Sequence, residues 1–223
     1  MINIIQTHSN IGFIQKVCET IKEQANESIK EKGSFTFVLS GGRTPKNIFI
    51  ELAKNYQNSI VWSKVHFFWL DERCVEPSHE DSNYKLAYDH LISKIDYVGS
   101  VHRIKGELEP DQAAQEYEEG IKEFFGANEV KFDFILLGMG EDGHIASLFP
   151  NSKELKLTNH IAFASEKQYH GHRRVTLGLE IINNSSIFLI INNKKYNIYK
   201  KKELKLPCHM LKDEVYIIRE IDV

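Results

Sequence analysis

A short apolar segment followed by a glycine-rich loop places the strongest constraint on how this chain can fold. Residues 132–137 read Phe-Asp-Phe-Ile-Leu-Leu, which is typical of a strand buried in a parallel sheet. The loop after it contains three glycines, two carboxylates and a histidine: Gly138, Gly140, Gly143, Glu141, Asp142 and His144. Because open α/β sheets bind ligands at the carboxyl ends of their strands, we expect a ligand site at this loop. His144 is the candidate catalytic base.

The same loop also fits the Gly-x-Gly-x-x-Gly spacing of dinucleotide-binding folds, with Glu166 as a candidate ribose-binding acid. Two features weigh against that alternative. The carboxylates in the loop would repel a pyrophosphate, and Pro150 ends any helix within about two turns. A metal site built from Asp142 and His144 is also disfavoured, because no second histidine or cysteine follows at ligand spacing. We therefore expect neither an organic cofactor nor a metal.

Composition narrows the class of protein. With 223 residues, 42% of them hydrophobic, the chain can bury a sizeable core, and its net charge of −3 disfavours non-specific binding to nucleic acid. No segment has the apolar length of a membrane span, and the N-terminus lacks the basic start and apolar core of a signal peptide. Three widely separated cysteines suggest reduced thiols, so we expect a cytoplasmic protein. The oligomeric state stays open between a monomer and a small homo-oligomer.

Arginine use points to an anionic ligand. The chain has 22 lysines but only six arginines, and four of the six fall in segments that stand out on other grounds: Arg43, Arg73, Arg173 and Arg174. The planar guanidinium matches the geometry of phosphate and carboxylate groups better than an ammonium does. Sparing but clustered arginines therefore indicate an anion site.

Strand-like and helix-like segments alternate along the chain. Strands are expected at residues 2–5, 35–39, 65–70, 101–105, 132–137, 160–165, 174–179, 186–191 and 215–219, and helices at 11–32, 45–55, 83–93, 111–125 and 192–204. This alternation predicts one Rossmann-like α/β domain over residues 1–223. Its sheet should be doubly wound and mostly parallel, with helices on both faces and right-handed crossovers.

A second loop follows the strand at 35–39 and reads Ser40-Gly41-Gly42-Arg43-Thr44-Pro45. We expect Thr44 to cap the next helix and Pro45 to take its first position. A glycine pair before a helix N-terminus can bind phosphate through free N–H groups, although a tight turn is an equally good explanation. A charged triplet, Asp71-Glu72-Arg73, follows the strand at 65–70 and should reach the same sheet edge.

Taken in order, these motifs resemble the 6-phosphogluconolactonases over nearly the whole chain. The shared segments are Ser-Gly-Gly-Arg-Thr-Pro at 40–45, Asp-Glu-Arg-Cys-Val at 71–75 with Asp-Ser-Asn-Tyr at 81–84, Gly-Met-Gly-Glu-Asp-Gly-His at 138–144, Arg-Val-Thr-Leu at 174–177 and a lysine near 195. The related glucosamine-6-phosphate isomerase/deaminases share the fold and are the alternative. They carry Asp-Glu-Tyr where this chain has Arg73, and a proton-transferring glutamate where it has Phe149. Their chains are also usually longer.

The chain departs from the lactonase pattern in two places. The proline after the Asp-Glu-Arg motif is displaced by one residue, as Val75-Glu76-Pro77. Asn192 and Asn193 replace the glycines that usually precede the last helix, and we expect asparagine to preserve the turn because it tolerates positive φ. The resemblance then favours Lys195 over Lys194 as the functional lysine.

The resemblance implies hydrolysis of 6-phospho-D-glucono-1,5-lactone to 6-phospho-D-gluconate in the oxidative pentose phosphate pathway. His144 would be the general base that activates water, which suits an imidazole because it titrates near neutral pH. Asp142 would orient it. The substrate phosphate would be bound by the second loop and three cationic side chains: Gly41, Gly42, Arg43, Thr44, Arg73, Arg174 and Lys195. The partner implied is thus a small phosphorylated sugar lactone.

Overall fold

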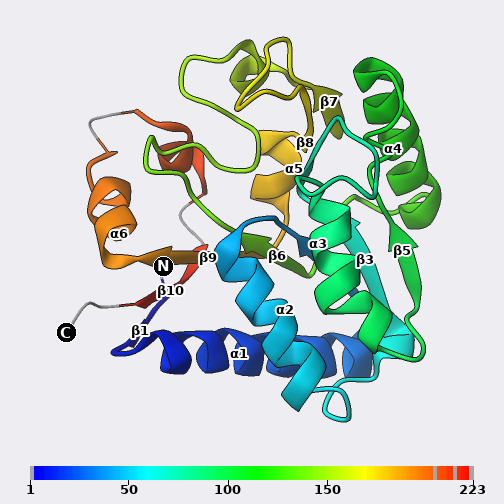
Figure 1. Ribbon diagram of the computed structural model, residues 1–223, viewed down its shortest axis with the longest axis vertical. Helices are drawn as coiled ribbons and strands as arrows, with labels where there is room; N and C mark the ends of the chain where they lie inside the picture. Colours follow the sequence, from blue (N-terminus) through cyan, green and yellow to red (C-terminus); the bar gives the residue numbers. More distant parts are fainter. Residues whose placement is uncertain (1–2, 203–204, 213–214, 221–223) are drawn as a thin grey trace.

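Seven parallel strands form the centre of the protein in the computed structural model, which describes residues 3–202, 205–212 and 215–220 (Figure 1). In spatial order they are β1 (Asn3–Thr7), β10 (Val215–Glu220), β9 (Ile187–Asn192), β6 (Phe134–Leu137), β2 (Phe35–Leu39), β3 (Val65–Trp69) and β5 (Ser100–His102). Every neighbouring pair is parallel. The predicted α/β class with a mostly parallel, doubly wound sheet is confirmed.

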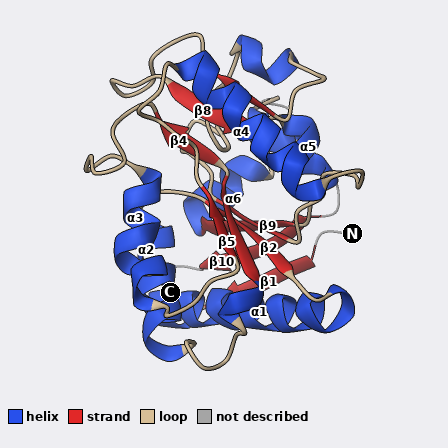
Figure 2. Ribbon diagram, turned by 90° about the vertical axis from the view of Figure 1, so that its right-hand side faces the viewer, coloured by secondary structure: helices blue, strands red, loops and turns tan. Residues whose placement is uncertain are grey.

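Helices cover both faces of this sheet. One set is α1 (Asn10–Lys32), α2 (Arg43–Asn55) and α3 (Asn83–His90), and the other is α4 (Pro110–Phe125), α5 (Leu179–Asn184) and α6 (Asn193–Tyr199). Figure 2 shows α2 and α3 on one side of the strands and α4 and α5 on the opposite side. Single 3₁₀ turns lie at η1 (Trp62–Lys64), η2 (Ile92–Lys94), η3 (Lys153–Lys156) and η5 (Pro207–Met210). In the described part of the chain no helix is long and apolar enough to cross a membrane.

The longest helix, α1, follows directly from its sequence. Its N-cap is Ser9, whose hydroxyl accepts a hydrogen bond from the backbone N–H of Gly12, and its end is Gly33 at φ 83°. Apolar residues at helical spacing, among them Val17 and Ile21, are fully buried. The helix packs along β1, β2 and β10 and so ties the first strand to the centre of the sheet.

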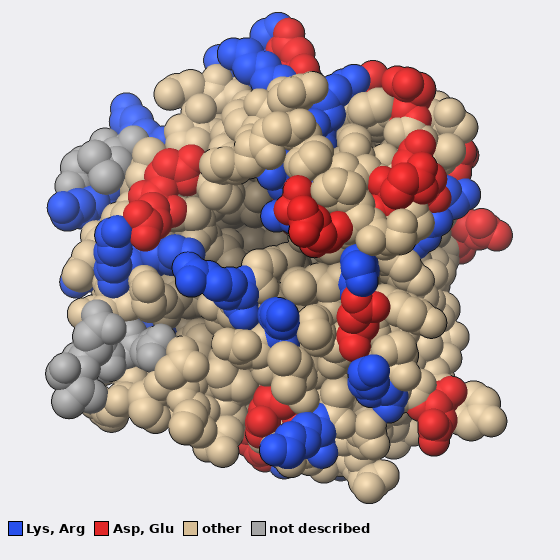
Figure 3. Space-filling view, viewed as in Figure 1, with Lys and Arg blue, Asp and Glu red and all other residues tan. Residues whose placement is uncertain are grey.

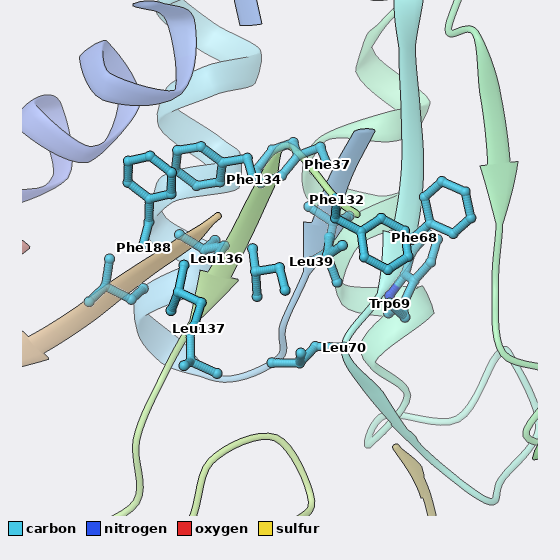
Figure 4. Close-up of a cluster of buried hydrophobic side chains, with 14 of the residues drawn as sticks. Phe37, Leu39, Phe68, Trp69, Leu70, Phe132, Phe134, Leu136, Leu137 and Phe188 are labelled. Carbon is cyan, nitrogen blue, oxygen red and sulfur yellow. The ribbon is translucent and has the colours of Figure 1, made fainter. Parts of the chain in front are cut away.

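Aromatic side chains pack across the central strands (Figure 4). Phe37 of β2 pairs in register with Phe134 of β6, with ring centroids 5.4 Å apart, and Phe134 stacks on Phe188 of β9 at 3.8 Å. All five residues of β2 are buried, as expected for a strand covered on both faces. The rigid strands that result hold the loops at their carboxyl ends in fixed positions.

Three further strands form a second, antiparallel sheet: β4 (Asp71–Arg73), β8 (Arg174–Leu177) and β7 (Ala162–Ala164). This differs from the expectation that the segments at 160–165 and 174–179 extend the alternating pattern. Arg174 begins its strand, as the predicted bounds have it, and it pairs directly with Arg73. A buried carboxylate on α4, Glu118, accepts hydrogen bonds from the N–H groups of Ile161 and Ala162 and so anchors the small sheet.

Several predicted element boundaries are corrected. The strand expected from Phe132 starts at Phe134, the strand at 101–105 is Ser100–His102, and α5 was not predicted. The last helix ends at Tyr199. Its predicted end, Leu204, lies outside the described residues, and so does Ile2, the predicted start of the first strand. These errors concern element ends and short elements, for which local periodicity carries little information.

Strand order also places the ligand-binding edge. From β2 the chain winds outward through β3 to β5, and from β6 it winds the other way through β9 to β10, while β2 and β6 are hydrogen-bonded neighbours. The loops after these two strands therefore diverge at the sheet's topological switch point. Crevices for ligands form there in open α/β sheets.

Candidate active site

A cleft of about 360 Å³ opens at this switch point. Figure 3 shows a hollow near the centre of this face, with lysine and arginine side chains along its rim. All but one of the expected site residues line the cleft: Gly41, Gly42, Arg43, Thr44, Arg73, His144, Arg174 and Lys195. The exception, Asp142, is not a lining residue but contacts the imidazole of His144. The sequence-based set is thus brought together in space, and the roles of its members stay predictions.

The loop after β2 leads directly into α2. Its N-cap is Gly42 at φ 103°, with no side-chain hydrogen bond at the cap, so the expectation that Thr44 caps this helix is wrong. The helix begins at Arg43, and Pro45, expected first, is its third residue, a position in the first turn where its missing N–H is not needed. An uncapped first turn leaves N–H groups available to an anion, and the helix dipole favours negative charge there.

A buried hydrogen-bond network forms one wall of the cleft. The amide of Asn83 donates to the backbone oxygen of Asp71 at 2.8 Å, and the hydroxyl of Ser147 donates to Oδ2 of Asp71 at 2.6 Å. A Cβ on Gly41 would lie 1.8 Å from the side-chain oxygen of Asn83, so only glycine permits this approach. The three polar residues line the cleft but were not predicted as site residues. The signal for two of them was present in the motifs at 71–75 and 81–84.

Glu72 stabilises this wall of the cleft through hydrogen bonds to the start of α3. Its carboxylate accepts hydrogen bonds from the N–H groups of Asn83 and Tyr84, each at 2.7 Å, and from the hydroxyl of Ser82. Burial raises the pKa of Glu72 to about 6, against the opposing effect of these backbone hydrogen bonds. Ser82 accepts a hydrogen bond from the N–H of Lys85 and is the N-cap of α3.

His144 and Asp142 form a close pair at the end of the loop after β6. Nδ1 of the imidazole lies 2.6 Å from Oδ1 of Asp142, and the backbone N–H of His144 donates to the same oxygen at 3.2 Å. Partial burial opposes the charge on Asp142, but the contacts with His144 outweigh it and lower the pKa of the carboxyl. A Cβ on Gly140 would lie 2.2 Å from the imidazole, which explains a glycine at that position. The loop thus holds the imidazole of His144 through its Nδ1 side.

Cationic side chains without carboxylate partners line the cleft. In the described part of the chain, neither Arg43, Arg73, Arg174 nor Lys195 takes part in an ion pair. Arg174 is only 5% exposed, and Nε of both Arg73 and Arg174 is buried with no hydrogen-bond partner among the described residues. Burial lowers the pKa of Arg174 and of Lys195. Arg174 is buried, Arg73 and Lys195 are half-buried and Arg43 is exposed. Cations that lack ion-pair partners and are partly removed from water favour an anion that comes from outside the chain.

Two neighbouring cations point elsewhere. Lys194 forms an ion pair with Glu141 at 2.8 Å, while Lys195 lines the cleft. Arg173, one of the clustered arginines, donates to the backbone oxygen of Ser165 and does not line the cleft.

The turn before α6 forms without the positive φ that we expect of asparagine there. Asn192 is extended at φ −84° and accepts from the N–H of Lys195 as an N-cap.

The hairpin between β7 and β8 supplies one cleft residue that the sequence did not predict, and an aromatic ring behind the lining. His170, at its tip, lines the cleft, and the ring of Tyr169 stacks on Phe149 with centroids 3.7 Å apart. Phe149 in turn lies 4.5 Å from the ring of His144. These contacts join segments that are apart in sequence, so no local pattern predicts them. Among the described residues, no group of three or more His, Cys, Asp or Glu side chains could hold a metal ion.

Comparison with known proteins agrees with this geometry. The family model described as glucosamine-6-phosphate isomerases/6-phosphogluconolactonase matches residues 9–216. The chain belongs to this family. A probable 6-phosphogluconolactonase 1 from Arabidopsis thaliana is 35% identical over 199 residues, which cover 84% of this chain and 74% of that protein. A 6-phosphogluconolactonase from a Nostoc species is 33% identical, over 82% of this chain and 78% of that protein.

Coverage varies among the plant relatives. A chloroplastic 6-phosphogluconolactonase 3 from Arabidopsis thaliana is 39% identical over 70% of this chain, but the matched part is only 52% of that protein. Among solved structures, a 6-phosphogluconolactonase from Thermotoga maritima superposes over 100% of both chains with a TM-score of 0.86 and 26% identity. The fold is therefore that of the lactonases over its full length.

Proposed function

We propose that this protein hydrolyses 6-phospho-D-glucono-1,5-lactone to 6-phospho-D-gluconate, a step of the oxidative pentose phosphate pathway. The observation that carries the proposal is a cleft in which an aspartate-held histidine and several unpaired cations share one cavity. The cations suit the phosphate and the histidine suits ester hydrolysis. The names of the related proteins agree with this substrate.

In the proposed mechanism, Nε2 of His144 takes a proton from water as the water oxygen attacks C1 of the lactone. The resulting imidazolium is stabilised by Asp142, which holds Nδ1. The bond between C1 and the ring oxygen then breaks, and the imidazolium gives its proton to that oxygen. The products are the free hydroxyl and the carboxylic acid, and His144 is neutral again. Asp142 keeps the tautomer in which Nε2 is the basic nitrogen.

The phosphate would be bound at the start of α2, by Gly41, Gly42, Arg43 and Thr44, and by the three side chains of Arg73, Arg174 and Lys195. These groups come from four different parts of the chain, so the anion fixes the far end of the substrate. Holding the substrate at that end sets the position of the lactone carbonyl relative to His144.

One contact favours a lactonase over the isomerase/deaminase alternative. The phenyl ring of Phe149 is 6% exposed and lies against the ring of His144. An isomerase of this fold would have a proton-transferring glutamate at that position, and a phenyl ring cannot transfer protons.

A coupled assay of phosphogluconolactone hydrolysis, corrected for spontaneous hydrolysis, tests the proposal. Turnover should greatly exceed the spontaneous rate, and glucosamine 6-phosphate should not be converted. Conversion of glucosamine 6-phosphate without lactone hydrolysis would assign the isomerase function instead.

A further inference from the structure

The hairpin between β7 and β8 ends in a tight two-residue turn at the edge of the cleft. Tyr169 and His172 are hydrogen-bonded to each other through their backbones, with Tyr169 N to His172 O at 2.8 Å. The two residues between them, His170 and Gly171, have φ values of 52° and 86°. Positive φ at both central positions is the geometry of a type I′ turn, which matches the twist of the flanking strands. The turn therefore keeps Tyr169 next to His170, which lines the cleft.

Tyr169 has two contacts that lead in different directions. Its backbone oxygen accepts a hydrogen bond from Nη2 of Arg174 at 3.0 Å. Its ring stacks on Phe149 at an interplanar angle of 7° and a centroid distance of 3.7 Å. Phe149 then meets the imidazole of His144 at 4.5 Å with a tilt of 35°. An unbroken series of contacts runs from a buried arginine to the histidine.

We propose that Tyr169 is a positioning residue that couples anion binding at Arg174 to the orientation of the His144 imidazole. The inference rests on the proposed function, because it takes Arg174 as a phosphate ligand and His144 as the base. Asp142 restrains the imidazole at Nδ1, and Phe149 restrains it at the ring face. The stacked ring of Tyr169 holds Phe149 in that position.

The physical basis is the incomplete bonding of Arg174. Its guanidinium is buried, has no carboxylate partner in the described part of the chain and leaves Nε without an acceptor there. A phosphate would supply the missing charge and acceptors and would fix the guanidinium. Because Nη2 of that guanidinium holds the oxygen of Tyr169, the fixed arginine also orders the hairpin tip. The ring of Tyr169 then presses Phe149 into one position against His144.

The first test compares Tyr169→Ala with Tyr169→Phe. The alanine variant should lose on the order of 10-fold in kcat, with a smaller change in KM, because misplacing a catalytic group costs rate. The phenylalanine variant keeps the stacking ring and the backbone oxygen, so it should stay within about twofold of the parent. Tyr97→Ala, at a tyrosine that is 80% exposed, is the matched control and should change nothing. Tyr169→Leu replaces the alanine variant if that one does not fold.

The second test reads the imidazole directly. Histidine ¹⁵N resonances are recorded with and without inorganic phosphate, and those of His144 are identified by their loss in His144→Ala. In the parent protein, phosphate should shift and sharpen them. In Tyr169→Ala, phosphate should still bind while the His144 resonances respond much less. An equal response in both proteins, or equal kinetic losses in Tyr169→Phe and Tyr169→Ala, would overturn the coupling.

These outcomes are separate from a failure of the proposed function. If His144→Ala keeps its hydrolytic activity, the role of His144 as the base is wrong, whatever Tyr169 does. If His144→Ala is inactive but Tyr169→Ala has the parent kcat, the base stands and the positioning role of Tyr169 is wrong.

Discussion

Nδ1 of His144 lies 2.6 Å from Oδ1 of Asp142, so the carboxylate contacts one ring nitrogen and not the other, Nε2. The pair is two residues apart in sequence, and Gly143 between them has φ 81°. That left-handed conformation lets the chain turn back on itself so that the carboxylate meets its neighbour's ring. A Cβ on Gly143 would also lie 2.6 Å from the side chain of Leu206.

His144→Ala should reduce kcat by about 10²–10⁴, because a general base contributes that much to proton transfer. Phosphate binding should be retained, since the cations that line the cleft are unaffected. Steady-state kinetics and phosphate titration measure the two effects. A kcat within a few-fold of the parent value would contradict the role of His144.

The pH profile distinguishes a base from a phosphate-binding cation. If neutral His144 activates water, kcat/KM should rise with pH as the imidazole loses its proton; a cationic ligand would make it fall. The low pKa of Asp142 keeps this carboxylate charged through that window, where it stabilises the imidazolium. Asp142→Asn should therefore move the acidic limb of the profile to lower pH. The substrate phosphate also titrates near pH 6, so the two profiles must be compared with each other.

Arg73→Ala and Arg174→Ala should each weaken binding of phosphorylated ligands by roughly 1.5–3 kcal/mol, the range of a charge-assisted hydrogen bond. An unphosphorylated lactone should be affected little by either change. Arg103→Ala is a suitable control, because Arg103 pairs with Glu107 and does not line the cleft. Equal losses with both lactones would mean that the two arginines support the fold and not the ligand.

Gly41→Ala should destabilise the protein by about 1–3 kcal/mol and weaken phosphate binding, because its Cβ would collide with Asn83 in the cleft wall. Gly120→Ala is the matched control. A Cβ there meets nothing within 4 Å, and alanine is the better helix former by up to about 1 kcal/mol, so this variant should be slightly more stable. Urea unfolding and phosphate titration compare the two. If Gly41→Ala has the stability and phosphate affinity of the parent, the side chain of Asn83 can move aside without cost and the close approach is not required.

A relay of two histidines outside the cleft should make the protein sensitive to acid. Ser100 Oγ lies 2.7 Å from Nδ1 of His66 and 2.6 Å from Nε2 of His102. Burial lowers the pKa of both histidines, with the charge of Lys64 adding to the effect at His66, while Glu123 opposes it at His102. The unfolded chain therefore binds protons more readily than the folded one.

It follows that the free energy of unfolding is maintained at neutral pH and falls as the pH drops below about 6.5, the ordinary value for histidine. Replacing both rings by amides, as His66→Asn with His102→Gln, keeps hydrogen-bonding groups at the same places but removes the titration. Urea unfolding at several pH values between 7 and 5 measures the slope. The double variant should show a shallower slope than the parent, and an identical slope would exclude the relay as its source.

Much of this protein was determined by its sequence alone. The apolar run of β2 is a local signal, because a strand that is buried on both faces needs apolar residues. The ends of α1 are local signals as well, because the unpaired N–H groups of its first turn favour a serine such as Ser9 and its left-handed last position favours a glycine such as Gly33. The sequence also predicts the cleft residues that follow the parallel strands β2, β6 and β9, because parallel strands bring their carboxyl ends to a single edge of the sheet. These residues are Gly41, Gly42, Arg43, Thr44, His144 and Lys195.

The pairing of the short strands depends on tertiary packing and could not be predicted from local sequence. Strand β4 has three residues, too few for a periodic pattern, and it is a strand because Arg174 and its neighbours lie beside it. The same holds for Tyr169, whose place against Phe149 depends on a hairpin and on a loop from another strand. Contacts between residues far apart in the chain depend on side-chain packing and on buried hydrogen bonds, and neither can be predicted from a local stretch of sequence.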